Sequence, residues 1–235
     1  MPFITKVDFA RQVKQYSGTT TFLSGSTNVN ENFSATTIFS GSSNIDSLFQ
    51  NRGMFRDIYF DAAEFTPLIN SGATFNTEEY TGSSINTGNL ISDYYSFTGS
   101  STDESIQVRL KFPDEYDLGT IKTKIYWDPA SGSTIGEQVT WGIRGRNFNN
   151  NYTLSAETIF GTEVKVTDTI LLVENLHITS ASTEITISGE PALDGLVYLQ
   201  VTRKVNDSTD TSLKSAKFLG MAIQYKEHLT GTTIW

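Results

Sequence analysis

Short runs in which apolar and polar residues alternate dominate residues 93–227 of the chain. Such alternation places one face of a β-strand against a core and the other toward water. No helical period interrupts these runs. The pattern predicts strands at residues 105–112, 121–127, 138–144, 163–166, 169–173, 184–187, 195–205 and 217–225.

The near-regular spacing of these runs predicts an all-β fold, a jelly-roll-like antiparallel β-sandwich that forms a knob over residues 93–229. Turn-forming residues separate the runs, as at residues 128–132 and 190–195. We expect residues 230–235 to form a short C-terminal tail.

The N-terminal segment, residues 1–18, has the pattern of a short amphipathic helix. Thr5 and Asp8 have the spacing of a capping box, and Gly18 marks a helix end. A helix of this length is marginal in isolation, so its apolar side needs a partner. It either folds back on its own domain or docks onto another chain, and the repeat that follows favours docking. The predicted docking residues are Phe3, Ile4, Val7, Phe9 and Val13.

An internal repeat follows the predicted helix. The segment TTFLSGSTNV at residues 20–29 recurs as TTIFSGSSNI at residues 36–45. Burying one of its bulky side chains is worth about 1.5–3 kcal/mol, against about 1–2 kcal/mol of backbone entropy for every ordered residue. Repeats of this kind therefore need neighbours to build a core.

Three identical chains wound around one axis would bring the apolar residues of the repeat together. We therefore predict an interwoven, β-rich stalk of a homotrimer over residues 19–50, although a polar linker that only looks periodic remains the alternative. The predicted trimer contacts are Phe22, Leu23, Val29, Ile38, Phe39 and Ile45. Residues 51–92 are expected to form irregular connections with one or two short strands.

The composition argues against several classes of partner. The formal net charge of −9 is opposite to what non-specific nucleic-acid binding requires. No run approaches the roughly 20 apolar residues of a membrane helix, and the first residues lack the apolar core of a signal peptide. We therefore expect no nucleic-acid partner, no membrane partner and a soluble, cytoplasmically made protein.

Candidate catalytic and metal-binding residues are few. The chain has no cysteine and only two histidines, so we expect neither a zinc site nor a cofactor. His177 lies on an alternating run and is interpreted as a surface or half-buried strand residue. Carboxylates in the turns near Asp114, Asp207 and Asp210 could hydrolyse a glycosidic bond only if two faced each other across a cleft. Turn carboxylates are usually turn formers, so we predict no enzymatic activity.

Aromatic residues make up 12% of the chain, and their side chains are the candidates for a binding surface. Trp127 and Trp141 lie within predicted strands and are therefore assigned to the core. Tyr152 follows an asparagine-rich turn and is the best exposed candidate for a glycan contact.

Two parts of the sequence resemble virion structural proteins of tailed bacteriophages. Residues 2–15, running into Ser/Thr/Gly-rich repeats, resemble the opening of such proteins, in which an N-terminal segment docks to the particle and a fibrous region follows. The alternating stretches between residues 110 and 227 resemble a β-sandwich domain at the C-terminal end of phage fibre and decoration proteins.

The resemblance implies a structural or receptor-facing role, with no catalytic residues to carry over. We predict a capsid-attached head fibre or decoration protein of a virion assembled in the host cytoplasm. It would form a homotrimer and dock through its N-terminus to other virion proteins, such as the major capsid protein. The alternatives are a tail-fibre tip, a carbohydrate-binding module that recognises host surface glycans, and, less favoured, a jelly-roll major capsid protein.

Overall fold

The computed structural model describes residues 55–80, 89–99, 102–154 and 160–227. The chain divides into two compact units, Met1–Gly53 and Met54–Trp235, and the described residues all belong to the second. The predicted docking helix and stalk, with their contact residues from Phe3 to Ile45, lie outside the described residues and stay predictions.

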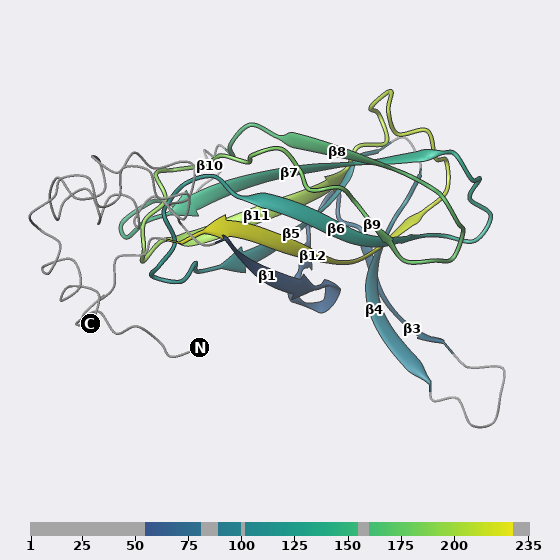
Figure 1. Ribbon diagram of the computed structural model, residues 1–235, viewed down its shortest axis with the longest axis horizontal. Coiled ribbons are helices and arrows are strands. Elements are labelled where there is room, and N and C mark those ends of the chain that lie inside the picture. Colours follow the sequence, from purple (N-terminus) through teal and green to yellow (C-terminus); the bar gives the residue numbers. More distant parts are fainter. Residues whose placement is uncertain (1–54, 81–88, 100–101, 155–159, 228–235) are drawn as a thin grey trace, which may run out of the picture. The chain divides into compact units, whose positions relative to one another are not determined.

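The described residues form two β-sheets that pack face to face (Figure 1). Sheet A contains β1 (Phe55–Asp61), β3 (Thr74–Tyr80), β4 (Leu90–Phe97), β6 (Lys122–Pro129), β9 (His177–Ile178) and β12 (Ala216–Lys226). Sheet B contains β2 (Thr66–Pro67), β5 (Glu104–Leu110), β7 (Gln138–Phe148), β8 (Val164–Thr169), β10 (Ile187–Ser188) and β11 (Leu196–Arg203).

The strand order is β3-β4-β12-β6-β9 in sheet A, where β1 also pairs with β12, and β10-β7-β11-β5-β2 in sheet B, where β8 also pairs with β7. Apart from the parallel β10–β7 pair, the strand pairs of the described residues are antiparallel. The predicted all-β, jelly-roll-like antiparallel β-sandwich is therefore confirmed. Within the described ranges the one-turn 3-10 helix Ala62–Glu64 is the only helix, so none there is long and apolar enough to cross a membrane.

Most predicted runs of the sandwich form strands, and two differ. The run at residues 169–173 does not continue as a strand, because Ile170 bonds to Glu137 and Gly136 in a loop. Leu171 and Leu172 then turn outward. In the run at residues 184–187 only Ile187 belongs to a strand, β10. Short edge segments have one neighbouring strand at most, so alternation alone overestimates their pairing.

The described residues within the range 51–92 contribute more to the sandwich than the irregular connections that were expected there. Strand β1 pairs with β12 along its whole length, from Phe55 opposite Lys226 to Asp61 opposite Gly220. The sandwich therefore begins at Phe55 and not near residue 93. Strand β12 pairs with β4 up to Phe218 and with β1 from Gly220 onward, and its register with β6 shifts between these two residues.

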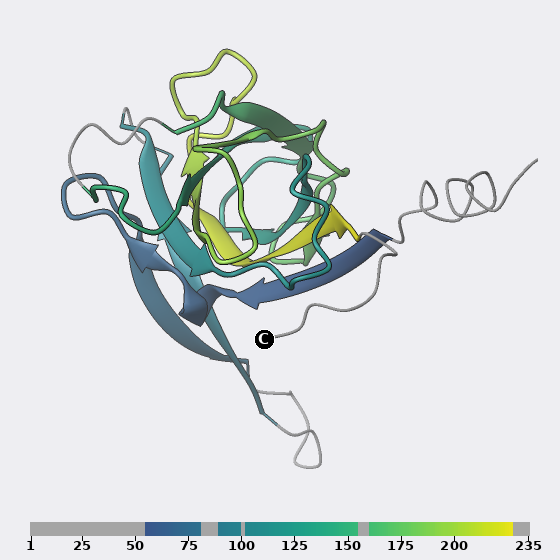
Figure 2. The same cartoon turned by 90° about the vertical axis from the view of Figure 1, so that its left-hand side faces the viewer.

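The core between the sheets is aromatic at its centre. Trp127, Trp141, Phe97 and Phe218 are all fully buried, which confirms the core assignment of both tryptophans. The rings of Phe97 and Trp141 meet edge to face with centroids 5.2 Å apart, a favourable aromatic geometry. Seen along the strands, the two sheets curl around this core (Figure 2). This packing fixes the strands and so fixes which side chains face outward.

The hairpin of β3 and β4 extends beyond the sandwich (Figures 1 and 2). It exposes large apolar side chains: Phe75 near its base, opposite Tyr95, and Tyr80, Leu90 and Ile91 in its outer part. Exposed apolar patches of this kind mark interaction surfaces in soluble proteins.

Candidate functional site

The outward face of sheet B carries an ordered array of polar and aromatic side chains. On β11, Val197, Leu199 and Val201 point into the core and are buried. Because side chains alternate along a strand, Tyr198 and Gln200 point outward. Strand β11 lies between β5 and β7, so the outward residues of three adjacent strands form one surface.

The strand register defines the neighbours on this surface. Tyr198 lies directly between Arg146 of β7 and Arg109 of β5. One step along the strand, Gln200 lies between Arg144 and Gln107. The Cβ atoms of directly opposed residues are about 4.5–5.5 Å apart, so each row is continuous across the three strands.

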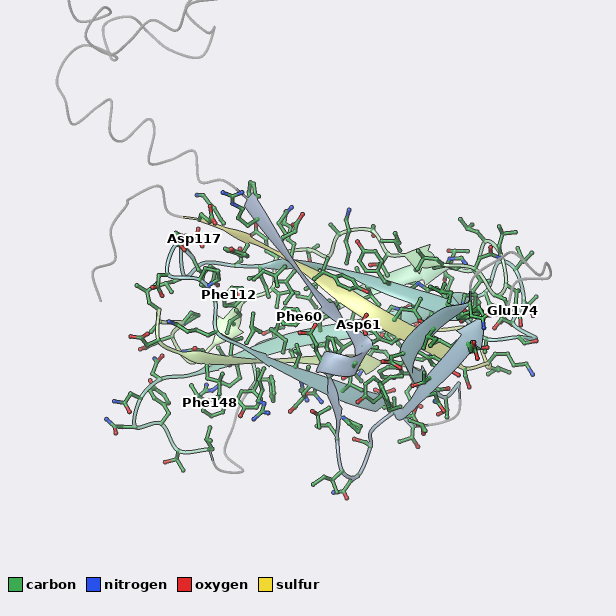
Figure 3. All side chains as sticks on the ribbon, turned by 90° about the horizontal axis from the view of Figure 1, so that it is seen from below. Phe60, Asp61, Phe112, Asp117, Phe148 and Glu174 are labelled. Carbon is green, nitrogen blue, oxygen red and sulfur yellow. The ribbon has the colours of Figure 1, made fainter. Side chains whose placement is uncertain are left out.

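A groove lies on this face, and we name it the β11 groove. Its volume is about 270 Å³, and it is lined by Gln107, Phe148, Leu154, Phe160 and Tyr198. The rings of Phe148 and Tyr198 meet edge to face with centroids 5.4 Å apart. Phe148 lies near one end of the sandwich, opposite the end that carries Glu174 (Figure 3). The groove therefore offers apolar ring surfaces beside an amide.

Two arginines of the face rest on aromatic rings. The guanidinium carbon of Arg144 lies 5.0 Å from the ring centre of Phe160, and that of Arg146 lies 5.5 Å from the ring centre of Phe148. Arg144 Nε also donates a hydrogen bond of 2.8 Å to Gln200 Oε1. These contacts hold the planar guanidinium groups in place.

Gln107, Arg109 and Tyr198 are the polar side chains of this face that stay available to a ligand. In the part of the chain that the structure describes, no hydrogen bond or ion pair engages the side chains of Gln107, Arg109 or Tyr198. Glu163 lies over Gly142, which is one outward position before Arg144 on β7. Its carboxylate is 3.4 Å from Lys204 Nζ and is therefore already paired with a cation.

Sheet A carries a second, smaller hollow on its outward face. Its volume is about 110 Å³, and its lining includes Asp57, Tyr126 and Gln224. Gln224 Nε2 donates to Asp57 Oδ1 at 3.2 Å, and Tyr59 packs edge to face on Tyr126 with centroids 5.2 Å apart. Lys122 and Lys124 also line it, and Tyr126 is its only aromatic lining residue. Because its volume is smaller and it offers a single ring, it is the weaker candidate.

Tyr152, the residue predicted to contact a glycan, lies in the turn after β7. Its ring is 44% exposed, and its backbone N–H donates to Asn149 at 3.1 Å. It comes two residues before Leu154, which lines the β11 groove, but Tyr152 does not line the groove itself. Its role as a contact stays a prediction.

His177 lies on β9 as expected, but it is buried, not half-exposed. Its Nε2 donates to the carbonyl of Leu172 at 2.8 Å, and its ring centroid lies 4.9 Å from that of Trp127. Trp127 Nε1 in turn donates to Asp168 at 2.9 Å. The histidine therefore attaches β9 and the preceding loop to the core.

The carboxylates considered for glycoside hydrolysis are engaged in structural contacts. Lys165 donates a hydrogen bond to Asp207 and holds the pKa of that carboxyl well below its usual range. A general acid needs a raised pKa, so Asp207 is unsuited to that role. Asp210 pairs with buried Arg203, and Asp114 pairs with Lys111. Among the described residues, no group of three or more His, Asp or Glu side chains is placed to hold a metal ion.

The residues of the β11 groove were not identified from the sequence. Phe148 lies beyond the predicted end of its strand, and Tyr198 and Gln200 lie within a run that was assigned only as a strand. The available signal was the alternation itself, which assigns both Tyr198 and Gln200 to the face opposite the core residues Val197 and Leu199.

No protein-family model matches the chain, and no curated protein matches it. Solved structures with a similar fold include a family 11 carbohydrate-binding module from Clostridium thermocellum in complex with a β-1,3-1,4-mixed-linked tetrasaccharide. It is 14% identical and covers 74% of this chain and 98% of its own, with a TM-score of 0.37.

Two further structures share the fold at a similar level. The C-terminal CBM6 of LamC from Zobellia galactanivorans is 12% identical and covers 72% of this chain and 98% of its own, with a TM-score of 0.32. The enzymatically active domain of bacteriophage CBA120 tailspike protein 4 is 6% identical and covers 74% of this chain but 20% of its own, with a TM-score of 0.32. These likenesses concern the sandwich architecture, and the assignment of the site depends on its own geometry.

Proposed function

We propose that the sandwich is a non-catalytic module that binds a glycan in the β11 groove. The observation that carries this proposal is the Phe148–Tyr198 ring pair, set on an outward sheet face beside planar amide and guanidinium groups. Sugars present apolar C–H faces that pack on aromatic rings and hydroxyls that bond to amides and guanidinium groups. Binding sites commonly combine an apolar lining with a few placed polar groups in this way.

The strands that bear the site also supply the rigidity that binding needs. The inward neighbours of Tyr198 on β11, Val197 and Leu199, are buried in the core. Gln200 is only 3% exposed and is oriented by Arg144 Nε. A surface already held in its binding geometry loses little conformational entropy when a ligand arrives, which raises affinity.

The test is to screen the full chain on a glycan array and to measure the dissociation constants of the hits by calorimetry. We expect Tyr198→Ala and Phe148→Ala each to weaken binding by about tenfold, because each removes a ring surface worth roughly 1.4 kcal/mol. Tyr126→Ala, on the outward face of sheet A, is the matched control and should leave binding unchanged.

Two results would contradict the proposal. An array on which no glycan is bound would reject the glycan-binding function. Binding that is lost in Tyr126→Ala but kept in Tyr198→Ala would transfer the function to the hollow on sheet A.

A second proposal concerns where this module is mounted. We propose that the chain is a bacteriophage virion protein, a homotrimeric head fibre or decoration protein or a tail-fibre tip, which displays the sandwich as a knob. The sequence resemblance and the repeat at residues 20–45 support it. The exposed apolar side chains of the β3–β4 hairpin support it as well, because assembly would cover them. The two proposals are compatible, since a displayed knob can bind a host glycan.

Light scattering on the full chain tests the assembly. A homotrimer should have three times the mass of the chain, and the double substitution of Ile38 and Phe39 by Asp should dissociate it, because it places charges in the predicted apolar contact.

Deletion of residues 1–17 should leave a folded knob that no longer joins particles. A monomer at micromolar concentration would reject the trimer, and continued incorporation would reject the docking helix.

A further inference from the structure

We propose that the glycan bound in the β11 groove is acidic and carries carboxylate groups, as uronic-acid polysaccharides do. This inference rests on the proposed function and names the class of its ligand. It follows from the charge of the face that bears the groove, which is opposite in sign to the charge of the whole chain.

The outward face of sheet B collects cations in an acidic protein. The formal net charge of the chain is −9, yet Arg109, Arg144 and Arg146 all point outward on adjacent strands around Tyr198 and Gln200. A sugar stacked on Tyr198 would therefore lie between Arg109 and Arg146, which are its directly opposed neighbours. An acid group on the β5 side of that sugar would be within reach of the exposed guanidinium of Arg109.

Arg144 is the most informative of the three. It is partly buried, and its contacts among the described residues are the ring of Phe160 and the amide of Gln200, neither of which carries a negative charge. Its Nε is used by Gln200 Oε1. The register of β7 and β8, extended by one residue, places Glu163 opposite Arg144, but that carboxylate is 3.4 Å from Lys204 Nζ and no described ion pair joins it to Arg144. Arg109, on the other flank, is exposed and likewise has no carboxylate partner in the described ranges.

A neutral glycan would fit this arrangement poorly. Covering a guanidinium with an uncharged ligand removes water from the cation and returns no opposite charge. An acid group restores that charge and adds hydrogen bonds that are about twice as strong as neutral ones. The planar guanidinium fork matches a planar carboxylate in a bidentate pair, which is why we assign carboxylate in preference to sulfate.

The experiment compares polysaccharides that differ in charge, using the full chain in affinity electrophoresis and calorimetry. The probes are polygalacturonate for carboxylate, dextran sulfate for sulfate, and dextran and mixed-linked β-glucan as neutral chains. We expect polygalacturonate to bind at least about tenfold more tightly than either neutral probe, and its affinity to fall as salt rises from 0.05 to about 0.5 M because the contact is ionic.

Substitutions then localise the effect. Arg109→Gln and Arg144→Gln should each weaken polygalacturonate binding by about tenfold, because each loses a charge-assisted hydrogen bond. Arg56→Gln makes the same change of charge on β1, where Arg56 pairs with Glu227 at 3.0 Å, and is the matched control. Arg144→Lys, which keeps the charge but loses the fork, should restore only part of the affinity for carboxylate. Arg109 is exposed, so its variant tests the inference even if a change at Arg144 impairs folding.

The outcomes separate the inference from the function on which it depends. Equal or tighter binding of the neutral probes, weakened by Tyr198→Ala, would overturn the acidic ligand and leave glycan binding intact. Tighter binding of dextran sulfate would overturn the carboxylate assignment. An equal loss in Arg56→Gln would show attraction by overall charge and overturn the assigned site. Failure to bind any glycan would reject the proposed function and the inference together.

Discussion

The sharpest stability prediction concerns the buried ion pair of Arg203 and Asp210. Their side chains are 0% and 1% exposed, and Arg203 Nε and Nη2 each lie 3.1 Å from a different oxygen of Asp210. The same guanidinium also donates to the carbonyls of Phe97 at 3.2 Å and Ser212 at 2.6 Å. Replacing Asp210 by Ala removes the anion and leaves the cation buried.

The size of the effect follows from these contacts. Breaking a buried pair by removing one partner costs about 3–5 kcal/mol. Asp210 Oδ2 also accepts from the backbone N–H of Thr140 at 3.1 Å, and an orphaned buried donor adds about 1–3 kcal/mol. The carbonyls that still contact Arg203 offset part of this, so we expect a loss of about 4 kcal/mol. Domains of this kind are stable by only about 5–15 kcal/mol.

Urea unfolding followed by tryptophan fluorescence measures the loss, because Trp127 and Trp141 are fully buried. With a slope of about 2 kcal/mol per molar urea, the midpoint of Asp210→Ala should fall by about 2 M. Asp194→Ala is the control. Asp194 is 90% exposed and pairs with Lys111 at 3.3 Å, and such surface pairs contribute at most about 1 kcal/mol. A loss below about 1 kcal/mol for Asp210→Ala would refute the assignment of a stabilising buried pair.

Three further predictions test the packing and the ionisation of the sandwich. Burial raises the pKa of the Tyr116 phenol in the folded state. The neutral buried phenol therefore contributes fully to the free energy of unfolding below about pH 10, and this contribution is lost as the pH rises toward the folded-state pKa. Tyr116→Phe should therefore show a smaller decline in urea midpoint between pH 8 and about pH 11 than the parent chain, and an equal decline would contradict this. Gly220→Ala should cost about 1–3 kcal/mol and speed amide exchange in β1, because a Cβ there would lie 2.6 Å from the carbonyl of Phe60; unchanged exchange would count against that contact. Trp127→Phe should lose about 2–4 kcal/mol in urea unfolding through a cavity and the missing bond to Asp168, whereas a neutral result would contradict the core assignment.

The alternating runs were sufficient to predict the fold class and six of the twelve described strands, namely β5, β6, β7, β8, β11 and β12. Alternation is a local property of the chain, and a sheet with one buried face imposes it on every strand that it contains. For the same reason Trp127 and Trp141 could be assigned to the core from their positions within runs. The sequence also indicated that Tyr152 would be exposed, because turn residues surround it.

Pairing between distant segments was decided only by the tertiary structure. Strand β1 belongs to the sandwich because β12 offers it an edge beyond the irregularity at Gly220, a contact between residues far apart in the chain. His177 is buried because Trp127 and the loop at Leu172 enclose it.

The candidate site shows the same division between local and long-range information. Alternation is enough to assign Tyr198 to an outward face, although the sequence analysis identifies only its strand. Its position between Arg109 and Arg146 depends on strand order and register, which place β5 and β7 on either side of β11. The alternation within each strand decides which of its side chains face outward. A binding surface forms only where the outward side chains of neighbouring strands lie side by side, and the packing of the whole sandwich decides which strands are neighbours.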